Sequence, residues 1–316
     1  MTEQTPDLLR ERIAALKAEI GQVIHGKDSA IELLLIALFA GGSALMEDVP
    51  GVGKTTLAKT LAKCVDATFH RIQFTPDLLP ADIVGASLFH PQTGSFEFRE
   101  GPVFCHILLA DEINRASPRT QSALLEAMGE GQATIEGRHY ALPKPFLVLA
   151  TQNPIDFHGT YPLPEAQLDR FLIALDLGYP AAEKELAMLF ALAERHPADT
   201  ARTVMTRDEV LAIQAAVRGV HVEEAIARYM VDIARATRAD PRLKLGMSPR
   251  ASLMLFRAAQ SAAYAAGRAF VLPDDVRRIA PDVLAHRLIL TSKAKYGGIG
   301  KRTIVAEILA GLKVPA

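Results

Sequence analysis

The segment from residue 44 to residue 64 constrains the fold of this chain more than any other. Its apolar start, Ala44–Met46, is typical of a short buried strand, and Thr55–Cys64 has the character of a helix. The loop between them ends in Gly51–Thr55 (GVGKT), which fits the last part of the phosphate-loop pattern G-x-x-x-x-G-K-[ST]. Taken alone, these few letters could be a surface turn. A strand before the loop and a helix directly after it instead predict a nucleotide-binding α/β core.

The chemistry of such a loop needs the residue types that stand here. Glycines allow successive backbone N–H groups to turn toward phosphate oxygens, Lys54 can reach the β- and γ-phosphates, and the Thr55 hydroxyl can hold Mg²⁺. The N-terminus of the following helix favours negative charge. The first glycine of the pattern is replaced by Asp48. We expect ATP to contact Asp48, Val49, Pro50, Gly51, Val52, Gly53, Lys54, Thr55 and Thr56.

Two carboxylates follow a second apolar run. Ile107–Ala110 is typical of a buried strand, and Asp111 and Glu112 come directly after it. Ligands of open α/β sheets bind at the carboxyl ends of the strands. We therefore expect Asp111 to hold Mg²⁺ through water and Glu112 to activate the attacking water as general base. The alternative is a strand that runs into an N-cap acid, which is common for one Asp but weaker for a pair downstream of a phosphate loop.

A neutral amide follows a third apolar run, Leu147–Ala150. Asn153 at that place could hydrogen-bond both the γ-phosphate and the attacking water. Taken alone, Asn153-Pro154 is more simply a turn. The functional interpretation of Asn153 therefore depends on the other two motifs.

Strand and helix signals alternate over the first 180 residues, which predicts a parallel sheet covered on both faces. Further strands are expected at 68–74, 104–110, 146–151 and 171–175, and helices at 28–39, 117–128 and 164–170. Two stretches interrupt the alternation. Ser87–Phe98 and Ala133–Leu142 each place turn residues between apolar or aromatic ones, which predicts two β-hairpin inserts.

The pattern changes after Gly178-Tyr179-Pro180. From about residue 181 the sequence is rich in alanine and helical in character, with helix starts expected at Ser248-Pro249 and Pro273-Asp274. We therefore expect an α/β nucleotide-binding core over residues 1–180 and a smaller all-α domain over residues 181–316.

Charge limits the classes of partner. The net charge is −1, so the whole chain has no electrostatic attraction to nucleic acid or to an anionic membrane. Residues 221–302 nevertheless carry 15 Lys/Arg and 7 Asp/Glu, a local balance of 15 − 7 = +8. A solvated basic face or a subunit contact is the simpler explanation, and a polyanion-binding patch is the alternative.

Cysteine usage and hydropathy indicate the compartment. The two cysteines, Cys64 and Cys105, lie far apart in apolar segments and give neither a disulfide framework nor a zinc spacing. The polar N-terminus has no signal-peptide character. The longest apolar run, residues 31–44, is shorter than the about 20 residues that a membrane-spanning helix needs. We expect a cytoplasmic protein without membrane insertion.

Taken together, these motifs resemble AAA+ ATPases, and specifically the MoxR family. The shared sequence words, in the family's order, are Glu47–Thr55, Gln73–Pro80, Ala110–Ala116, Gln121–Met128, Ala150–Pro154 and Leu163–Phe171. MoxR-like proteins also carry Asp where other phosphate loops have their first glycine, so Asp48 supports the resemblance. The resemblance implies an AAA+ core with helix-2 and pre-sensor-1 hairpin inserts, a helical lid, and the cofactors ATP and Mg²⁺.

The resemblance also implies roles for three further residues and an assembly. Such proteins usually form hexameric rings with the ATP site between neighbours. Asn153 matches sensor 1, Arg170 matches the arginine finger given to the next subunit, and Arg250 matches sensor 2. From the residues alone, Arg170 could as well cap a helix or form an ordinary ion pair. Whether Arg250 serves its own site or a neighbour's stays open.

The leading functional hypothesis is a ring-forming ATPase that remodels or matures partner protein complexes in a chaperone-like way. MoxR-type ATPases are typically encoded beside proteins with von Willebrand factor A domains, so such a partner is implied. The alternatives are a nucleotide-gated scaffold with little turnover, a nucleic-acid motor and a magnesium-chelatase-type motor subunit. Stable nucleic-acid binding is not expected, because the first hairpin is not notably basic.

Overall fold

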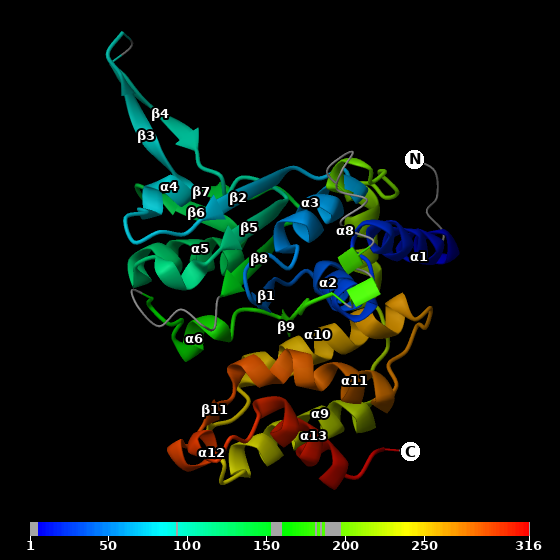
Figure 1. Cartoon of the computed structure of the whole chain (residues 1–316). Coiled ribbons are helices and arrows are strands. Elements are labelled where there is room, and N and C mark those ends of the chain that lie inside the picture. The colour runs from blue at the N-terminus through cyan, green and yellow to red at the C-terminus, as the bar shows by residue number, and fades with distance from the viewer. Residues whose placement is uncertain are drawn as a thin grey trace.

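Five parallel strands form the central sheet of the chain (Figure 1). The computed structural model describes residues 6–92, 94–152, 160–180, 182, 183, 185, 186 and 197–315. The strand order is β2-β5-β8-β1-β9, and every neighbouring pair is parallel. The bounds are β1 (Ala44–Glu47), β2 (Phe69–Gln73), β5 (Ile107–Asp111), β8 (Leu147–Gln152) and β9 (Ile173–Leu175). The predicted parallel α/β core is confirmed.

Helices cover both faces of this sheet. They are α1 (Pro6–Val23), α2 (Asp28–Ala40), α3 (Lys54–Cys64), α4 (Pro80–Val84), α5 (Pro118–Glu130) and α6 (Glu165–Leu168). Along β5, Ile107 and Leu109 enter a hydrophobic cluster with α1, α2 and α3, whereas Leu108 and Ala110 enter a second cluster with α4 and α5. Successive strand residues point to opposite faces, so a strand buried on both sides is a continuous apolar run.

The two hairpins lie where the sequence predicts them. The first pairs β3 (Gly85–His90) with β4 (Ser95–Glu100), and the second pairs β6 (Gln132–Ile135) with β7 (Arg138–Ala141). The first extends away from the body of the molecule (Figure 1). In the second, Glu136 and Gly137 have φ angles of 50° and 78°, as a tight hairpin turn requires.

Two expected strands begin later than the sequence suggests. The strand expected from residue 104 begins at Ile107, because the backbone N–H groups of Phe104 and Cys105 donate to Gly101 and Val103 in local turns. The strand expected from residue 171 begins at Ile173.

The C-terminal part is helical, as expected. Its helices are α8 (Arg207–Arg218), α9 (Glu224–Ala239), α10 (Pro249–Ala265), α11 (Pro273–Leu284), α12 (Ser292–Tyr296) and α13 (Lys301–Gly311). It also contains a short antiparallel ribbon, β10 (Leu243–Leu245) with β11 (Ile289–Leu290), which the sequence reading missed. Helix α10 packs on α2, where the buried Ser261 hydroxyl donates to the Ile36 carbonyl over 2.9 Å. The helical part therefore shares one hydrophobic cluster with one face of the sheet.

Much of the positive charge of residues 221–302 is paired inside the chain. Ion pairs join Arg242 to Asp240, Arg268 to Asp275, Arg278 to Glu32, Arg287 to Asp169 and Arg302 to Asp282. Asp240, Asp275 and Asp282 are already counted in the local balance of +8, so these pairs leave the segment basic and do not decide between the two explanations.

Both cysteines are free and buried, as expected from their spacing. Burial raises the pKa of each thiol to about 12. None of the helices in the described part of the chain has the length and apolar character to cross a membrane.

Candidate nucleotide site

The phosphate loop connects the end of β1 to the start of α3. Gly51 and Gly53 have φ angles of 86° and 96°, a left-handed conformation that glycine adopts without steric cost. The N-cap residue of α3 is Gly53, and no side chain caps the first N–H groups of this helix. Those N–H groups and the helix dipole form a binding site for an anion, which fits the phosphates of a nucleotide.

A cleft of about 380 Å³ opens above this loop. It is lined by Pro50, Gly51, Gly53, Lys54, Thr55, Thr56, Arg71, Gln73, Asp111 and Glu112. The sheet order explains the set, because β2 and β5 are neighbours and Gln73 pairs with Asp111 at their carboxyl ends. The structure therefore brings the phosphate loop and both carboxylates together. Their amide, hydroxyl, amine and carboxylate groups suit a nucleotide phosphate chain with its Mg²⁺.

Asp48 has a different place from the one expected. Its carboxylate is buried and accepts hydrogen bonds from the backbone N–H groups of Leu177 (2.5 Å) and Gly178 (3.0 Å). Only its carbonyl faces the loop lysine, since Lys54 Nζ donates to it over 2.9 Å. Asp48, Val49 and Val52 are not among the residues that line the cleft. The aspartate at the first glycine position thus anchors the loop to the segment after β9.

We expect Asp48→Ala to destabilise the protein. The N–H groups of Leu177 and Gly178 would lose their acceptor, which costs about 2 kcal/mol of the free energy of unfolding and, in a chain of this length, about 3 °C of melting temperature. Thermal unfolding measures this. The matched control is Asp176→Ala, which removes an exposed carboxylate after β9. Equal melting temperatures for the two variants would contradict the anchoring role.

Asp111 lies in the cleft with two partners that the sequence did not indicate. Its Oδ2 pairs with Arg71 Nη2 at 2.6 Å, and its Oδ1 accepts from the Thr151 hydroxyl over 2.6 Å. Arg71 comes from β2 and Thr151 from β8, the two strands beside β5. Asp111 is thus held from both sides, with Thr55 in the same cleft.

Glu112 is held next to it by donors on two other elements. Its Oε2 accepts from Gln73 Nε2 (2.8 Å) and Arg115 Nη1 (2.9 Å), and its backbone N–H donates to the Thr151 hydroxyl (2.8 Å). The Glu112 φ angle is 56°, an uncommon conformation for a residue other than glycine. Strained backbone of this kind concentrates at functional sites. Gln73 also accepts from Arg71 over 2.8 Å, so one polar network joins both carboxylates.

The two predicted arginines lie outside the cleft of their own chain. Arg170 is half-buried against α5, where its Nη1 donates to the Leu125 carbonyl over 2.9 Å. A Cβ on Gly129 would lie only 2.5 Å from that nitrogen, so glycine leaves room for the guanidinium. Arg250 is exposed in the first turn of α10. Asn153 lies outside the described residues.

Arg71, Gln73, Arg115 and Thr151 are the cleft and support residues that sequence reasoning missed. Arg71 and Gln73 alternate on β2 at its carboxyl end, and Thr151 ends the apolar run of β8. Polar residues at the carboxyl ends of expected parallel strands are the signal that could have found them.

Comparisons with known proteins bear on the family and the fold of this chain. Residues 43–173 match the family described as "ATPase family associated with various cellular activities (AAA)", and residues 235–308 match "AAA lid domain". The Bacillus subtilis protein YeaC is 49% identical over 94% of this chain and 92% of its own length. Chaperone MoxR1 of Mycobacterium tuberculosis is 42% identical over 94% of this chain and 81% of its own length. A solved structure from Cytophaga hutchinsonii has a TM-score of 0.92 at 40% identity, covering 99% of this chain and 98% of that one.

Proposed function

The chain belongs to the MoxR family of AAA+ ATPases, and we propose that it hydrolyses Mg·ATP to remodel or mature partner protein complexes in a chaperone-like way. One observation carries the hydrolysis part. The phosphate loop, Asp111 and Glu112 line a single cleft although the loop and the carboxylates lie far apart in the sequence. The chaperone-like part rests on the similarity to the relative named Chaperone MoxR1.

The site residues expected from the sequence have proposed tasks. Lys54 and the N–H groups of the loop bind the phosphates. Thr55 would hold Mg²⁺, and Asp111 would hold it through water. The metal ion would neutralise charge on the phosphates. Glu112 orients the attacking water and takes its proton. Asn153 is proposed to assist Glu112 as sensor 1.

A second copy of the chain is proposed to complete the site. Arg170 and Arg250 do not line the cleft of their own chain, which supports their donation to a neighbour. A head-to-tail interface generates a ring when the rotation between neighbours closes, and we propose a hexameric ring. A guanidinium given in trans stabilises negative charge on the transferring phosphoryl group. The proposed partner is a protein with a von Willebrand factor A domain.

Loss of Lys54 tests this proposal. We expect the purified protein to release phosphate from ATP only with Mg²⁺, and Lys54→Ala to weaken ATP binding about 10- to 100-fold, because charge-assisted hydrogen bonds to phosphate are lost. Fluorescent-nucleotide titration and phosphate release measure the two effects. Lys59→Ala is the matched control, since Lys59 is exposed on the same helix and does not line the cleft. Unchanged binding and turnover in Lys54→Ala would reject the site.

One observation favours a second candidate, a nucleotide-gated scaffold with little turnover. The Asp111 carboxylate forms an ion pair with Arg71, and the Glu112 carboxylate accepts hydrogen bonds from Gln73 and Arg115. Both carboxylates are therefore engaged in this conformation. Hydrolysis requires at least Glu112 to turn toward water. Binding of ATP without phosphate release, even at high protein concentration, would favour the scaffold.

A further inference from the structure

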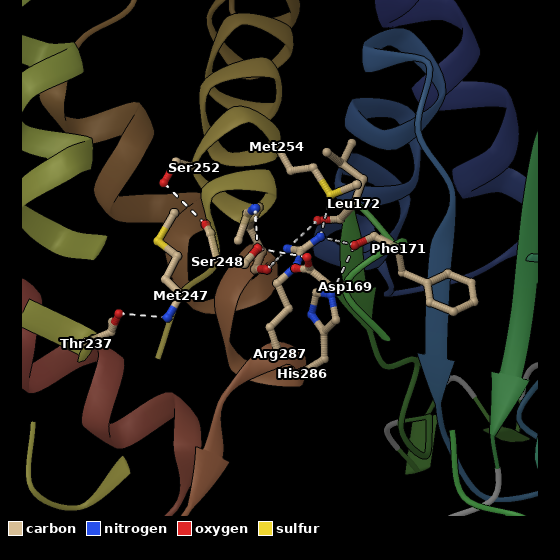
Figure 2. A network of polar contacts seen from close by, with 12 residues as sticks. Asp169, Phe171, Leu172, Thr237, Met247, Ser248, Ser252, Met254, His286 and Arg287 are labelled. Carbon is tan, nitrogen blue, oxygen red and sulfur yellow. Dashed lines mark hydrogen bonds and ion pairs between the residues drawn. The ribbon is translucent and has the colours of Figure 1, made fainter. Parts of the chain in front are cut away.

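Asp169, which directly precedes the proposed finger residue Arg170, contacts the lid, by which we mean helices α9 to α13 and their connections. Asp169 Oδ1 lies 3.0 Å from Arg287 Nε, and its Oδ2 accepts from the Ser248 hydroxyl over 2.8 Å. Figure 2 shows the Asp169 carboxylate between these two side chains. One carboxylate of the core therefore bridges two separate parts of the lid.

Arg287 is a buried cation with unusually many partners. Its side chain is 2% exposed, and its guanidinium also donates to the backbone carbonyls of Phe171, Val283 and Leu172. Burial lowers the pKa of Arg287 to about 10, while the neighbouring Asp169 carboxylate opposes this fall. A buried charge needs an opposite charge and hydrogen bonds to be tolerated, and Asp169 supplies the former.

The residue after the proposed finger is held as well. The Phe171 carbonyl accepts from Arg287 Nη2 and lies 3.1 Å from His286 Nε2. His286 is fully buried, and burial lowers its pKa well below the usual value, so the neutral ring donates through Nε2. The lid thus holds the residues on both sides of Arg170, Asp169 through its carboxylate and Phe171 through its carbonyl, whereas the Arg170 side chain has a hydrogen bond to Leu125 on α5.

Ser248 is fixed on the lid side. Its hydroxyl accepts from the Ala251 N–H over 3.0 Å and so caps α10, the helix whose first turn carries Arg250. The preceding residue, Met247, donates its N–H to the Thr237 hydroxyl and accepts from Arg238 Nε on α9. The start of α10 therefore has a defined position relative to Asp169.

We propose that Asp169 is a positioning residue that joins Arg170 and Arg250 into one rigid unit through Arg287 and Ser248. Asp169 does not line the nucleotide cleft of its own chain, so it acts through the two arginines. A movement of the lid in one subunit moves the base of Arg170 with it and changes the site of the neighbour. This inference rests on the proposed function of Arg170 as a finger given in trans.

The test begins with Asp169→Asn, which keeps the shape of the side chain and removes its charge. We expect ATP turnover to fall about 100-fold, because small misplacements of a catalytic group have effects of that size, and fluorescent-nucleotide affinity to stay within about twofold, because the cleft is untouched. Ser248→Ala is the milder second variant. It keeps the Asp169–Arg287 pair and should lower turnover about tenfold through partial loss of position.

Assemblies of mixed subunits distinguish whether Asp169→Asn misplaces the finger or damages the fold. Asp169→Asn subunits keep an intact cleft, and Glu112→Gln subunits keep an intact finger. When the two inactive proteins are mixed equally, about one interface in four combines an intact cleft from one subunit with an intact finger from the next. Turnover should therefore return. Arg170→Ala mixed with Glu112→Gln is the reference. Asp176→Asn, which breaks an exposed core–lid ion pair with Arg302, should be nearly neutral.

Each outcome decides whether Asp169 positions the finger. Turnover near that of the unmodified protein in Asp169→Asn overturns the inference. If Asp169→Asn loses turnover and only the Arg170→Ala reference mixture recovers it, the inference is also overturned, because Asp169 then matters for folding alone. No recovery in the reference mixture rejects Arg170 as a trans finger and the inference with it. Recovery in both mixtures establishes the positioning role.

Discussion

Arg170→Ala is expected to lower ATP turnover about 10³-fold, the lower end of what an arginine finger contributes. The affinity for ATP should change little, because Arg170 does not line the cleft of its own chain. Stability should change little as well, since the side chain is half-buried and its hydrogen bond goes to a backbone carbonyl, that of Leu125. Steady-state phosphate release and fluorescent-nucleotide titration measure the two quantities separately.

Two variants make this result specific. Arg170→Lys keeps the charge but loses the planar fork of donors, so it should recover only part of the turnover. Arg235→Ala removes an exposed arginine of α9 and should have no effect. A turnover for Arg170→Ala within a few-fold of the unmodified protein would leave the helix-capping explanation, in which Arg170 only binds a carbonyl of α5.

The parts of the fold that depend on local sequence were predictable. Leu45 and Leu108 belong to apolar runs, Gly53 precedes the helix Lys54–Cys64, and Ser117 and Ser248 cap helices that begin with proline. Each of these signals acts within a few residues. The ribbon β10–β11 was missed because its strands have three and two residues, too few for any periodicity to appear.

Polar residues at strand ends could have been picked out from the sequence, but which of them contact the two carboxylates could not be predicted, because those contacts depend on strand order. Arg71 reaches Asp111 only since β2 lies beside β5, and Thr151 reaches it since β8 lies on the other side. Strand order is a long-range property that composition and periodicity do not carry. The contact between Asp169 and Arg287 spans 118 residues and is of the same kind. The domain boundary near residue 180 stays a prediction.

The anchoring role of Asp48 shows how a motif can be right and its interpretation incomplete. The resemblance to the MoxR family includes Asp48, and the phosphate-loop pattern assigns this position to the nucleotide. The carboxylate instead binds the N–H groups of Leu177 and Gly178. Only the three-dimensional proximity of β1 and β9 reveals that partner.

Glu112→Gln is expected to lower turnover about 10²- to 10⁴-fold, because general-base catalysis contributes that much. The fold and the affinity for ATP should persist. The amide oxygen of glutamine can accept the same hydrogen bonds from Gln73 and Arg115 that Glu112 Oε2 accepts now. The loss should therefore appear in kcat, and the variant should retain bound ATP in single-turnover experiments.

A glutamate-to-glutamine substitution outside the cleft is the matched control for Glu112→Gln. Glu130→Gln changes an exposed glutamate at the end of α5 that does not line the cleft, and it should turn over ATP normally. A Glu112→Gln protein that turns over ATP as fast as Glu130→Gln would remove the general base from the proposed mechanism. Asp111 would then be the next candidate, although its carboxylate is engaged by Arg71 and Thr151 just as that of Glu112 is engaged by Gln73 and Arg115. Glu112 has a left-handed backbone and lines the same cleft, and strained backbone of this kind concentrates at functional sites, so we expect hydrolysis to need its charge most.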